Sequence, residues 1–142
     1  MNKSIIKSAV VYVGIVCLFV LICIACAKEE SNLTKIKDLE FTVLGNEEIP
    51  KELLETIEER KETAFKFTYS DGEYLYIAVG YGQQVSGGYH IQANQLYLTK
   101  NAIYCETTLI GPSEADIKKL PSFPYIVLKT EDRNMRVVFE SP

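Results

Sequence analysis

The chain has 142 residues, a length that fits one globular domain and a targeting segment. Its formal net charge is −4, and removing Lys3 and Lys7 with the first 26 residues leaves 13 basic against 19 acidic residues. Such an acidic remainder argues against nucleic acid as a ligand and against charge-driven contact with anionic lipid, because both ligands require basic patches.

The first 26 residues have the pattern of a secretory signal. Two lysines precede the apolar run Ala9–Ala25, and Cys26 follows it. Ala25 before Cys26 resembles the lipobox of bacterial lipoproteins, although Cys23 stands where that family usually has leucine. The resemblance implies that Cys26 becomes the mature N-terminus and carries a lipid anchor, with palmitate among its acyl chains.

An uncleaved transmembrane helix is the alternative interpretation of the same apolar run. The run has about 17–19 residues, the short end of what spans a bilayer. Both interpretations place the domain on the outer side of the bacterial cell membrane, because basic residues before an apolar segment stay in the cytoplasm. Residues 27–38 are polar and are predicted to form a tether, and residues 39–142 to form the globular domain.

Cys105 is the only cysteine of the predicted domain, because the other three lie in or at the end of the apolar run. This excludes a disulfide within the domain and a cysteine-based metal site. We expect Cys105 to pack as a small buried hydrophobe on a strand.

The domain is predicted to begin with a strand at Leu39–Leu44 and a helix at Ile49–Thr63. Pro50 suits the first helical position. Apolar residues recur at helical spacing, and four glutamates fall on the opposite face, where they are expected to be solvated. The predicted apolar stripe consists of Leu53, Leu54, Ile57 and Ala64.

Residues Phe65–Val79 are predicted to form a hairpin. A two-residue turn at Asp71–Gly72 pairs Tyr69 with Tyr74. Because side chains alternate along a strand, one face collects the aromatic residues and the other collects aliphatic residues. The predicted aromatic face holds Phe65, Phe67, Tyr69, Tyr74 and Tyr76, and the opposite face holds Leu75, Ile77 and Val79.

A second hairpin is predicted over Leu96–Ile110, with its turn at Lys100–Asn101. Asparagine tolerates the left-handed conformation that such a turn is expected to need. This register pairs Tyr97 with Tyr104 and leaves Leu96, Leu98, Ile103 and Cys105 on the opposite face.

The rest of the chain predicts a connection and two further strands. The connection is Gly111–Pro121, with a helical turn near residues 114–118, and the strands are Tyr125–Lys129 and Arg136–Glu140, around a polar turn at Glu131–Asn134. The predicted fold is α+β and mostly β. It is a twisted antiparallel sheet or open sandwich of about six strands, with one N-terminal helix packed on it.

The stretch Gly80–Ile91 holds four of the eight glycines. It is not a phosphate-binding loop, because it has no Gly-Lys-Ser/Thr and no helix is expected after it. Ser86 and His90 suggest a nucleophile and a base, but their spacing on a loop running into a strand does not bring them together. His90 is the only histidine, so we expect no metal, no cofactor and no enzyme activity.

Val85–Ile91 reads Val-Ser-Gly-Gly-Tyr-His-Ile and resembles the Pro-Thr-Gly-Gly-Tyr-Ser-Ile signature of the PrcB C-terminal domain family. Gly80–Gly82, Pro124–Thr130 and Val137–Glu140 are similar to neighbouring parts of the same family. The resemblance covers roughly Phe65 to Glu140. Two residues depart from the signature, since valine replaces its proline and serine replaces its threonine.

The resemblance implies a non-enzymatic accessory lipoprotein that stabilises a protease complex at the cell surface. The loop from Gln83 to Tyr89 is expected to contact a protein partner such as a protease. The predicted contact residues are Tyr81, Ser86, Gly87, Gly88 and Tyr89. Two alternatives stay open. One is protease inhibition by this loop, which is similar at loop level to that of chagasin-type inhibitors. The other is binding of cell-wall glycan on exposed tyrosines.

Overall fold

The chain divides into two compact units, residues 1–31 and 32–142. The computed structural model describes Lys3 and residues 34–140. The predicted signal, the lipidation site Cys26 and the first part of the predicted tether lie outside the described residues. Within these residues, no helix combines the length and the apolar character needed to cross a membrane.

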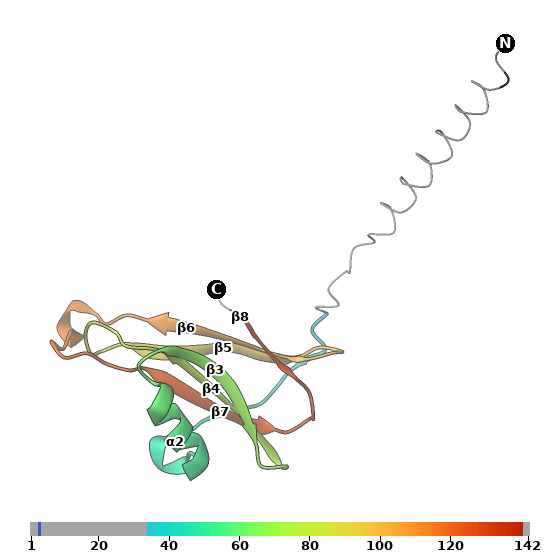
Figure 1. The fold of residues 1–142 in the computed structure, drawn as a ribbon, viewed down its shortest axis with the longest axis horizontal. Coiled ribbons are helices and arrows are strands. Elements are labelled where there is room, and N and C mark those ends of the chain that lie inside the picture. Colours follow the sequence, from blue (N-terminus) through green and yellow to red (C-terminus); the bar gives the residue numbers. More distant parts are fainter. Residues whose placement is uncertain (1–2, 4–33, 141–142) are drawn as a thin grey trace. The chain divides into compact units, whose positions relative to one another are not determined.

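The domain is an open sandwich of two four-stranded sheets, with one helix (Figure 1). The first sheet has the order β1 (Lys37–Asp38), β5 (His90–Leu98), β6 (Ile103–Ile110) and β8 (Val137–Glu140). The second has the order β2 (Thr42–Val43), β7 (Tyr125–Glu131), β4 (Tyr74–Tyr81) and β3 (Ala64–Ser70). The mostly-β α+β class is confirmed. The described domain has eight strands instead of six, and β6 and β8 pair in parallel.

Near the N-terminal and the C-terminal ends of the described sequence, the chain crosses from one sheet to the other. The predicted single strand Leu39–Leu44 is replaced by β1 in the first sheet and β2 in the second. Leu39 and Phe41 lie in the segment that joins β1 to β2, and both pack against the core between the sheets. This packing holds the segment where it crosses from one sheet to the other. Lys37–Asp38, assigned to the tether by the sequence, already pairs with β5. The polar turn after β7 likewise returns the chain to the first sheet, where β8 begins.

The helix α2 (Lys51–Arg60) packs on the second sheet, on the face away from the first (Figure 1). Leu53 and Ile57 are buried, as their spacing predicts. The helix is shorter than predicted at both ends, because Pro50 is its N-cap and Ala64 begins β3. Two 3-10 turns, η1 (Asn46–Glu48) and η2 (Glu114–Asp116), complete the described elements.

The second sheet separates two apolar cores. The core between the sheets is formed by Leu39, Leu75, Ile77, Val79, Leu96, Ile103, Cys105, Ile126 and Leu128. The core under α2 is formed by Ile49, Leu53, Ile57, Phe65, Tyr76, Ala78 and Val127. Cys105 is buried on β6 as predicted, and its burial raises the pKa of its thiol to about 11.

The β3–β4 hairpin has a register shifted by two residues from the prediction. Tyr69 pairs with Tyr76 instead of Tyr74. A shift of two residues keeps every side chain on its predicted face. The aromatic residues therefore still face α2, and the aliphatic residues of β4 still face the first sheet.

The Asp71 side chain accounts for this shift. Its Oδ1 accepts hydrogen bonds from the N–H of Glu73 at 3.0 Å and of Tyr74 at 2.7 Å. Asp71 therefore begins the turn, and its two central residues are Gly72 and Glu73. Gly72 has a φ of +94°, which suits the first central position of such a hairpin turn.

The β5–β6 hairpin has the predicted register. Tyr97 lies opposite Tyr104, and their rings stack with centroids 5.2 Å apart. A bulge at Asn94 interrupts the ladder. The Asn94 Nδ2 donates hydrogen bonds to Thr108 Oγ1 at 2.7 Å and to Glu106 Oε1 at 3.3 Å.

The turn of this hairpin is centred on Lys100–Asn101 as predicted, but its conformation differs from the prediction. Asn101 is not left-handed, since Asn134 is the only non-glycine residue with a positive φ in the described part of the chain. The buried Thr99 closes the turn instead. Its Oγ1 accepts hydrogen bonds from the N–H of Asn101 at 3.3 Å and of Ala102 at 3.2 Å.

Candidate functional site

Two loops meet at one end of the sandwich. Residues 82–89 join β4 to β5, and residues 111–124 join β6 to β7. We refer to these two loops as the paired-loop tip. Gln84 and Ser122 exchange backbone hydrogen bonds at 2.8 and 3.2 Å, and Gly87 N–H donates to Lys118 O at 3.0 Å. Ser122 Oγ also donates to Ser86 O at 2.6 Å. Each loop therefore supports the other.

The paired-loop tip is also fastened to the body of the domain. Gln83 N–H donates to Glu62 O, just after α2, at 3.1 Å. Tyr81 N–H donates to Pro124 O at 3.1 Å, at the start of β7. These bonds fix the start of the 82–89 loop, and the bonds to the 111–124 loop hold its middle, so the tip is a structured platform.

Gly87 and Gly88 lie in the seam between the two loops. Gly88 has a φ of +90°, and a Cβ there would lie 2.6 Å from Asp116 O and 2.7 Å from Pro112 Cβ. A Cβ at Gly87 would lie 2.9 Å from Lys118 Cβ. Only glycine allows the loops to approach this closely. The structure thus gives both glycines a role in holding the tip together.

The other predicted contact residues are only partly available to a partner. The Tyr81 hydroxyl donates a hydrogen bond to Thr107 O at 2.8 Å and so links the two sheets. Ser86 and Tyr89 are half-buried. No hydrogen bond joins Ser86 to the exposed His90 among residues 34–140, so the structure builds no nucleophile–base pair from them.

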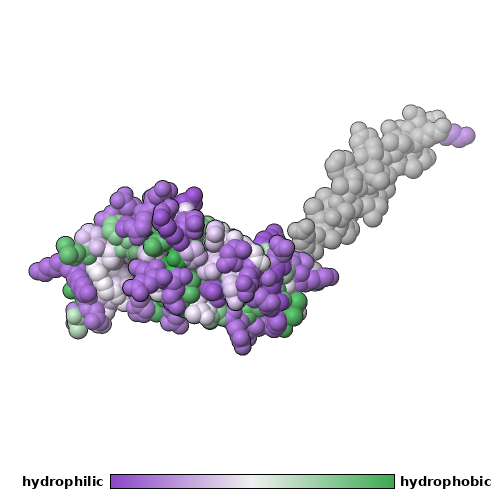
Figure 2. Space-filling view, turned by 90° about the horizontal axis from the view of Figure 1, so that it is seen from below, coloured by the Kyte–Doolittle hydropathy of each residue, from purple (hydrophilic) through white to green (hydrophobic). Residues whose placement is uncertain are grey.

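The most exposed side chains of the tip are apolar. Val85 is 86% exposed, Leu120 is 75% exposed and Ile117 is 55% exposed. Val85 and Leu120 both lie between the two bridges that join the loops. Figure 2 shows hydrophobic residues at this end of the domain, among hydrophilic neighbours. Large exposed apolar groups gathered in one place indicate an interaction site.

Sequence reasoning missed the second loop of this site. Ile117 and Leu120 were assigned to a simple connection, Gly111–Pro121. Two large apolar residues in an otherwise polar, proline-bounded loop were the available signal, because such residues normally belong to a core. The pairing of this loop with Gly80–Ile91 was not visible, since it depends on hydrogen bonds between distant segments.

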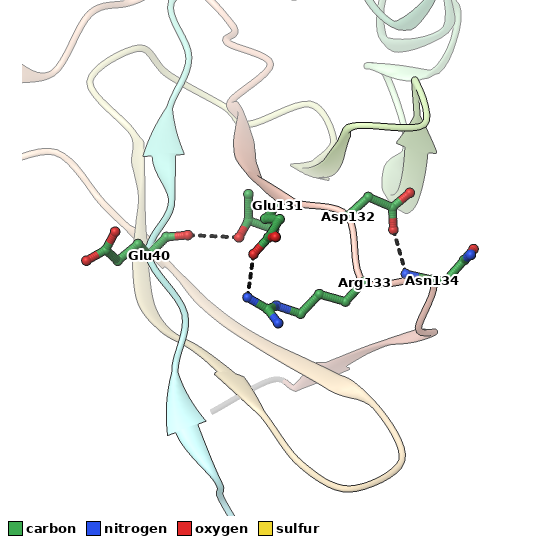
Figure 3. Close-up of polar contacts among 6 residues, drawn as sticks. Glu40, Glu131, Asp132, Arg133 and Asn134 are labelled. Carbon is green, nitrogen blue, oxygen red and sulfur yellow. Dashed lines mark hydrogen bonds and ion pairs between the residues drawn. The ribbon is translucent and has the colours of Figure 1, made fainter.

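A groove of about 970 Å³ lies at the opposite end of the sandwich. It is lined by Lys37, Asp38, Leu39, Glu40, Phe41, Thr42, Tyr74, Lys129, Thr130, Glu131 and Arg133. Figure 3 shows the polar contacts beside it, where Glu40 O accepts a hydrogen bond from Thr130 Oγ1 at 2.8 Å.

The charges of this groove balance one another. Three cations face three carboxylates, and Arg133 Nη2 pairs with Glu131 Oε2 at 2.5 Å (Figure 3). Lys129 Nζ lies 3.8 Å from the centre of the Tyr74 ring. Arg133 Nε is the one buried side-chain polar atom without a hydrogen-bond partner in the described domain. This balance selects neither an anion nor a cation, and no cluster of metal-ligating residues occurs in the same part of the chain.

Comparison with known proteins identifies one family. Neither the curated proteins nor the solved structures give a significant match. The family model described as PrcB C-terminal matches residues 75–131. The matched stretch runs from the second residue of β4 to the end of β7 and contains both loops of the paired-loop tip. Residues 75–131 of this chain therefore match the PrcB C-terminal domain.

Proposed function

We propose that the domain is a non-enzymatic accessory module that binds a protein partner through the paired-loop tip. The observation that carries this proposal is the exposure of Val85, Leu120 and Ile117 on two loops that hydrogen-bond to each other. Burying these side chains against a partner removes apolar surface from water. The ordered loops lose little conformational freedom on binding, which favours affinity.

The PrcB C-terminal match supports a protease complex as the setting of this interaction. We further propose that a lipid on Cys26 holds the protein to the outer side of the bacterial membrane. The domain geometry suits this arrangement. β1 pairs with the end of β5 that is remote from the tip, so the chain enters the domain at the end opposite the partner-binding loops.

Direct inhibition of a protease is a second candidate, because the same tip could enter an active-site cleft. Titrating the purified protein against a panel of extracellular proteases separates the two. Inhibition at stoichiometric concentration supports the second candidate, and binding without inhibition supports the accessory role.

Glycan binding on tyrosine faces has no support from the geometry. Tyr97 and Tyr104 stack on each other, and Lys35 Nζ lies 5.6 Å from the centre of the Tyr97 ring. Lys129 lies over Tyr74 in the same way. A sugar ring needs an open aromatic face, and each of these rings has a neighbour on at least one face.

The test of the accessory role is chemical crosslinking of the anchored protein in its own membrane. The variant Val85→Asp/Leu120→Asp places two charges on the tip and should abolish the crosslinked partner. The matched control is Ile36→Asp/Val43→Asp, which changes two other exposed apolar residues, 60% and 53% exposed, outside the paired-loop tip. A partner lost equally from both variants, or kept by both, would contradict a tip interface.

Gly88→Val is unsuitable for this test, because the new side chain would strike Asp116 O and disturb the tip itself. The anchor is tested separately with Cys26→Ser. We expect this variant to lose incorporation of labelled fatty acid, and continued labelling would refute lipidation at Cys26.

A further inference from the structure

One edge of β5 is uncovered along most of its length. β1 pairs only with the last two residues of β5, and Leu39 N–H adds one hydrogen bond to Leu96 O. From His90 to Gln95, this edge has no backbone partner among residues 34–140. The uncovered stretch begins where the 82–89 loop of the paired-loop tip ends.

The free backbone groups on this edge belong to Ile91 and Ala93. In an antiparallel ladder, successive residues direct their N–H and C=O groups to alternate edges. The carbonyls of Leu96 and Leu98 point to the outer edge, where they accept hydrogen bonds from the segment around β1 at 2.8 and 2.7 Å. The bulge at Asn94 inserts one residue and shifts this alternation by one.

The edge from residue 90 to 95 contains no lysine, arginine, aspartate, glutamate or proline. Natural proteins use these residues to prevent unwanted pairing of edge strands. β3, an edge strand of the second sheet, carries such a residue. Lys66 is exposed on the face toward the first sheet, with its Nζ 6.0 Å from the centre of the Phe139 ring. The β5 edge lacks this protection.

The chain's own N-terminal segment does not cover this edge within the described residues. β1 runs antiparallel to β5 and approaches from the Leu98 end. It leaves the first sheet after Leu39 and continues as β2 in the second. The edge beside the tip therefore stays open.

We propose that an extended segment of the protein partner adds to the first sheet along the β5 edge from His90 to Ala93. Unpaired backbone groups on a strand edge bind another extended backbone, so the chemistry of the edge selects the occupant. Ile91 and Ala93 are half-buried beside the core between the sheets, and apolar side chains at alternate positions of the segment would cover them. This inference rests on the proposed function, because the segment belongs to the partner that contacts the tip.

The test uses the full chain in detergent and, as probe, a phage-displayed library of random linear peptides of about ten residues. Ala93→Pro removes an N–H that the added strand needs, at an outward-facing position that tolerates proline. The matched control is Thr68→Pro on the free edge of β3. We expect selected peptides to bind Ala93→Pro about tenfold more weakly than the wild type and Thr68→Pro with unchanged affinity.

Hydrogen exchange provides a measurement without mutation. The amides of Ile91 and Ala93 should exchange rapidly in the free chain and about tenfold more slowly with a selected peptide bound. The amide of Gln92, which points toward β6, should change little. Exchange at Ile91 and Ala93 that the bound peptide leaves unchanged overturns the proposal, and so does failure of any linear peptide to be enriched.

A homodimer that Ala93→Pro dissociates also overturns the proposal, because the occupant is then a second copy of the chain. Failure of the proposed function has a different readout. It appears as a membrane crosslink that survives Val85→Asp/Leu120→Asp, whatever peptides bind to the β5 edge.

Discussion

The two ends of the sandwich close their loops in different ways. At the paired-loop tip, the backbone of one loop bonds to the backbone of the other. At the opposite end, side-chain oxygens do most of this: Asp71, Thr99 and Asp132 each accept hydrogen bonds from N–H groups of their own turn, and one backbone bond, from Asp132 N–H to Glu73 O at 3.0 Å, joins two of the turns. Where side chains close a turn, their polar atoms are already hydrogen-bonded within that turn. Where backbones join two loops, more side chains are left to face a partner.

The largest expected effect on stability comes from substituting two glycines that have similar φ, one at each end of the sandwich. Gly88→Ala at the tip should lower the free energy of unfolding by about 2–4 kcal/mol, because strain at φ +90° adds to the clash with Asp116 O. Gly72 has a φ of +94°, but a new Cβ there would have nothing within 4 Å. Gly72→Ala should therefore lower the free energy of unfolding by only about 1–2 kcal/mol. Urea unfolding of both variants measures the difference. Equal losses would show that the tip is not tightly packed.

Removing one hydroxyl at each end should give the next largest effect. Thr99→Val leaves the buried N–H of Ala102 without its acceptor and should cost about 1–3 kcal/mol. Ser122→Ala removes the half-buried hydrogen bond to Ser86 O and should cost about 0.5–1.5 kcal/mol. Thr99→Ser keeps the hydroxyl and is the control. A Thr99→Val variant as stable as the wild type, together with an unstable Thr99→Ser variant, would mean that the methyl group, and not the hydroxyl, supports the turn.

The turns at the end opposite the tip should also make the stability of the fold sensitive to acid. The N–H groups of Tyr74 and Glu73 lower the pKa of Asp71, and the Ser70 hydroxyl and the Asn134 N–H lower the pKa of Asp132. A carboxyl whose pKa is lowered by folding stabilises the fold above its unfolded pKa, near 4, and this contribution is lost as the pH falls through its folded value.

The melting temperature of the wild type should therefore fall below about pH 4. In Asp71→Asn/Asp132→Asn the fall should be smaller, because two of the responsible carboxyls are absent. Thermal melts across this pH range provide the measurement. Parallel curves for the two proteins would assign the acid response to other groups.

The smallest effect is expected from the apolar side chains of the tip. Val85→Asp and Leu120→Asp should each change the free energy of unfolding by about 0.5 kcal/mol or less, because both side chains face solvent. Circular dichroism melts of each variant check this. A large loss of stability would mean that these residues support the tip, and the crosslinking result would need a different variant.

Local patterns in the sequence predicted much of the fold. The apolar spacing of α2 placed Leu53 and Ile57 correctly, and alternation put the right residues on each face of β4. The register of β3 and β4 was wrong, because the capping bonds of the Asp71 side chain outweighed the Asp-Gly signal. The predicted strand Leu39–Leu44 failed because its alternation does not show that the chain changes sheets.

The candidate site was predicted in part. Gly87 and Gly88, two of the predicted contact residues, lie where two backbones come close. Tyr81 has an interior hydrogen bond that its sequence position did not reveal. The apolar residues Ile117 and Leu120 became part of the site only through hydrogen bonds between loops more than thirty residues apart, such as Ser122 Oγ to Ser86 O.

The crossing of the chain from β1 to β2 has a mechanical consequence. With the proposed anchor at the N-terminus and the proposed partner at the tip, a pull between them would act along the strands. Hydrogen bonds of a sheet lie across the strands, so such a load shears the short pairings of β1 with β5 and of β2 with β7 instead of opening their bonds one by one. The crossing through Leu39 and Phe41 also passes the load from the first sheet into the second. A domain loaded in this way resists extension, as a link between the proposed anchor and the proposed partner would need to do.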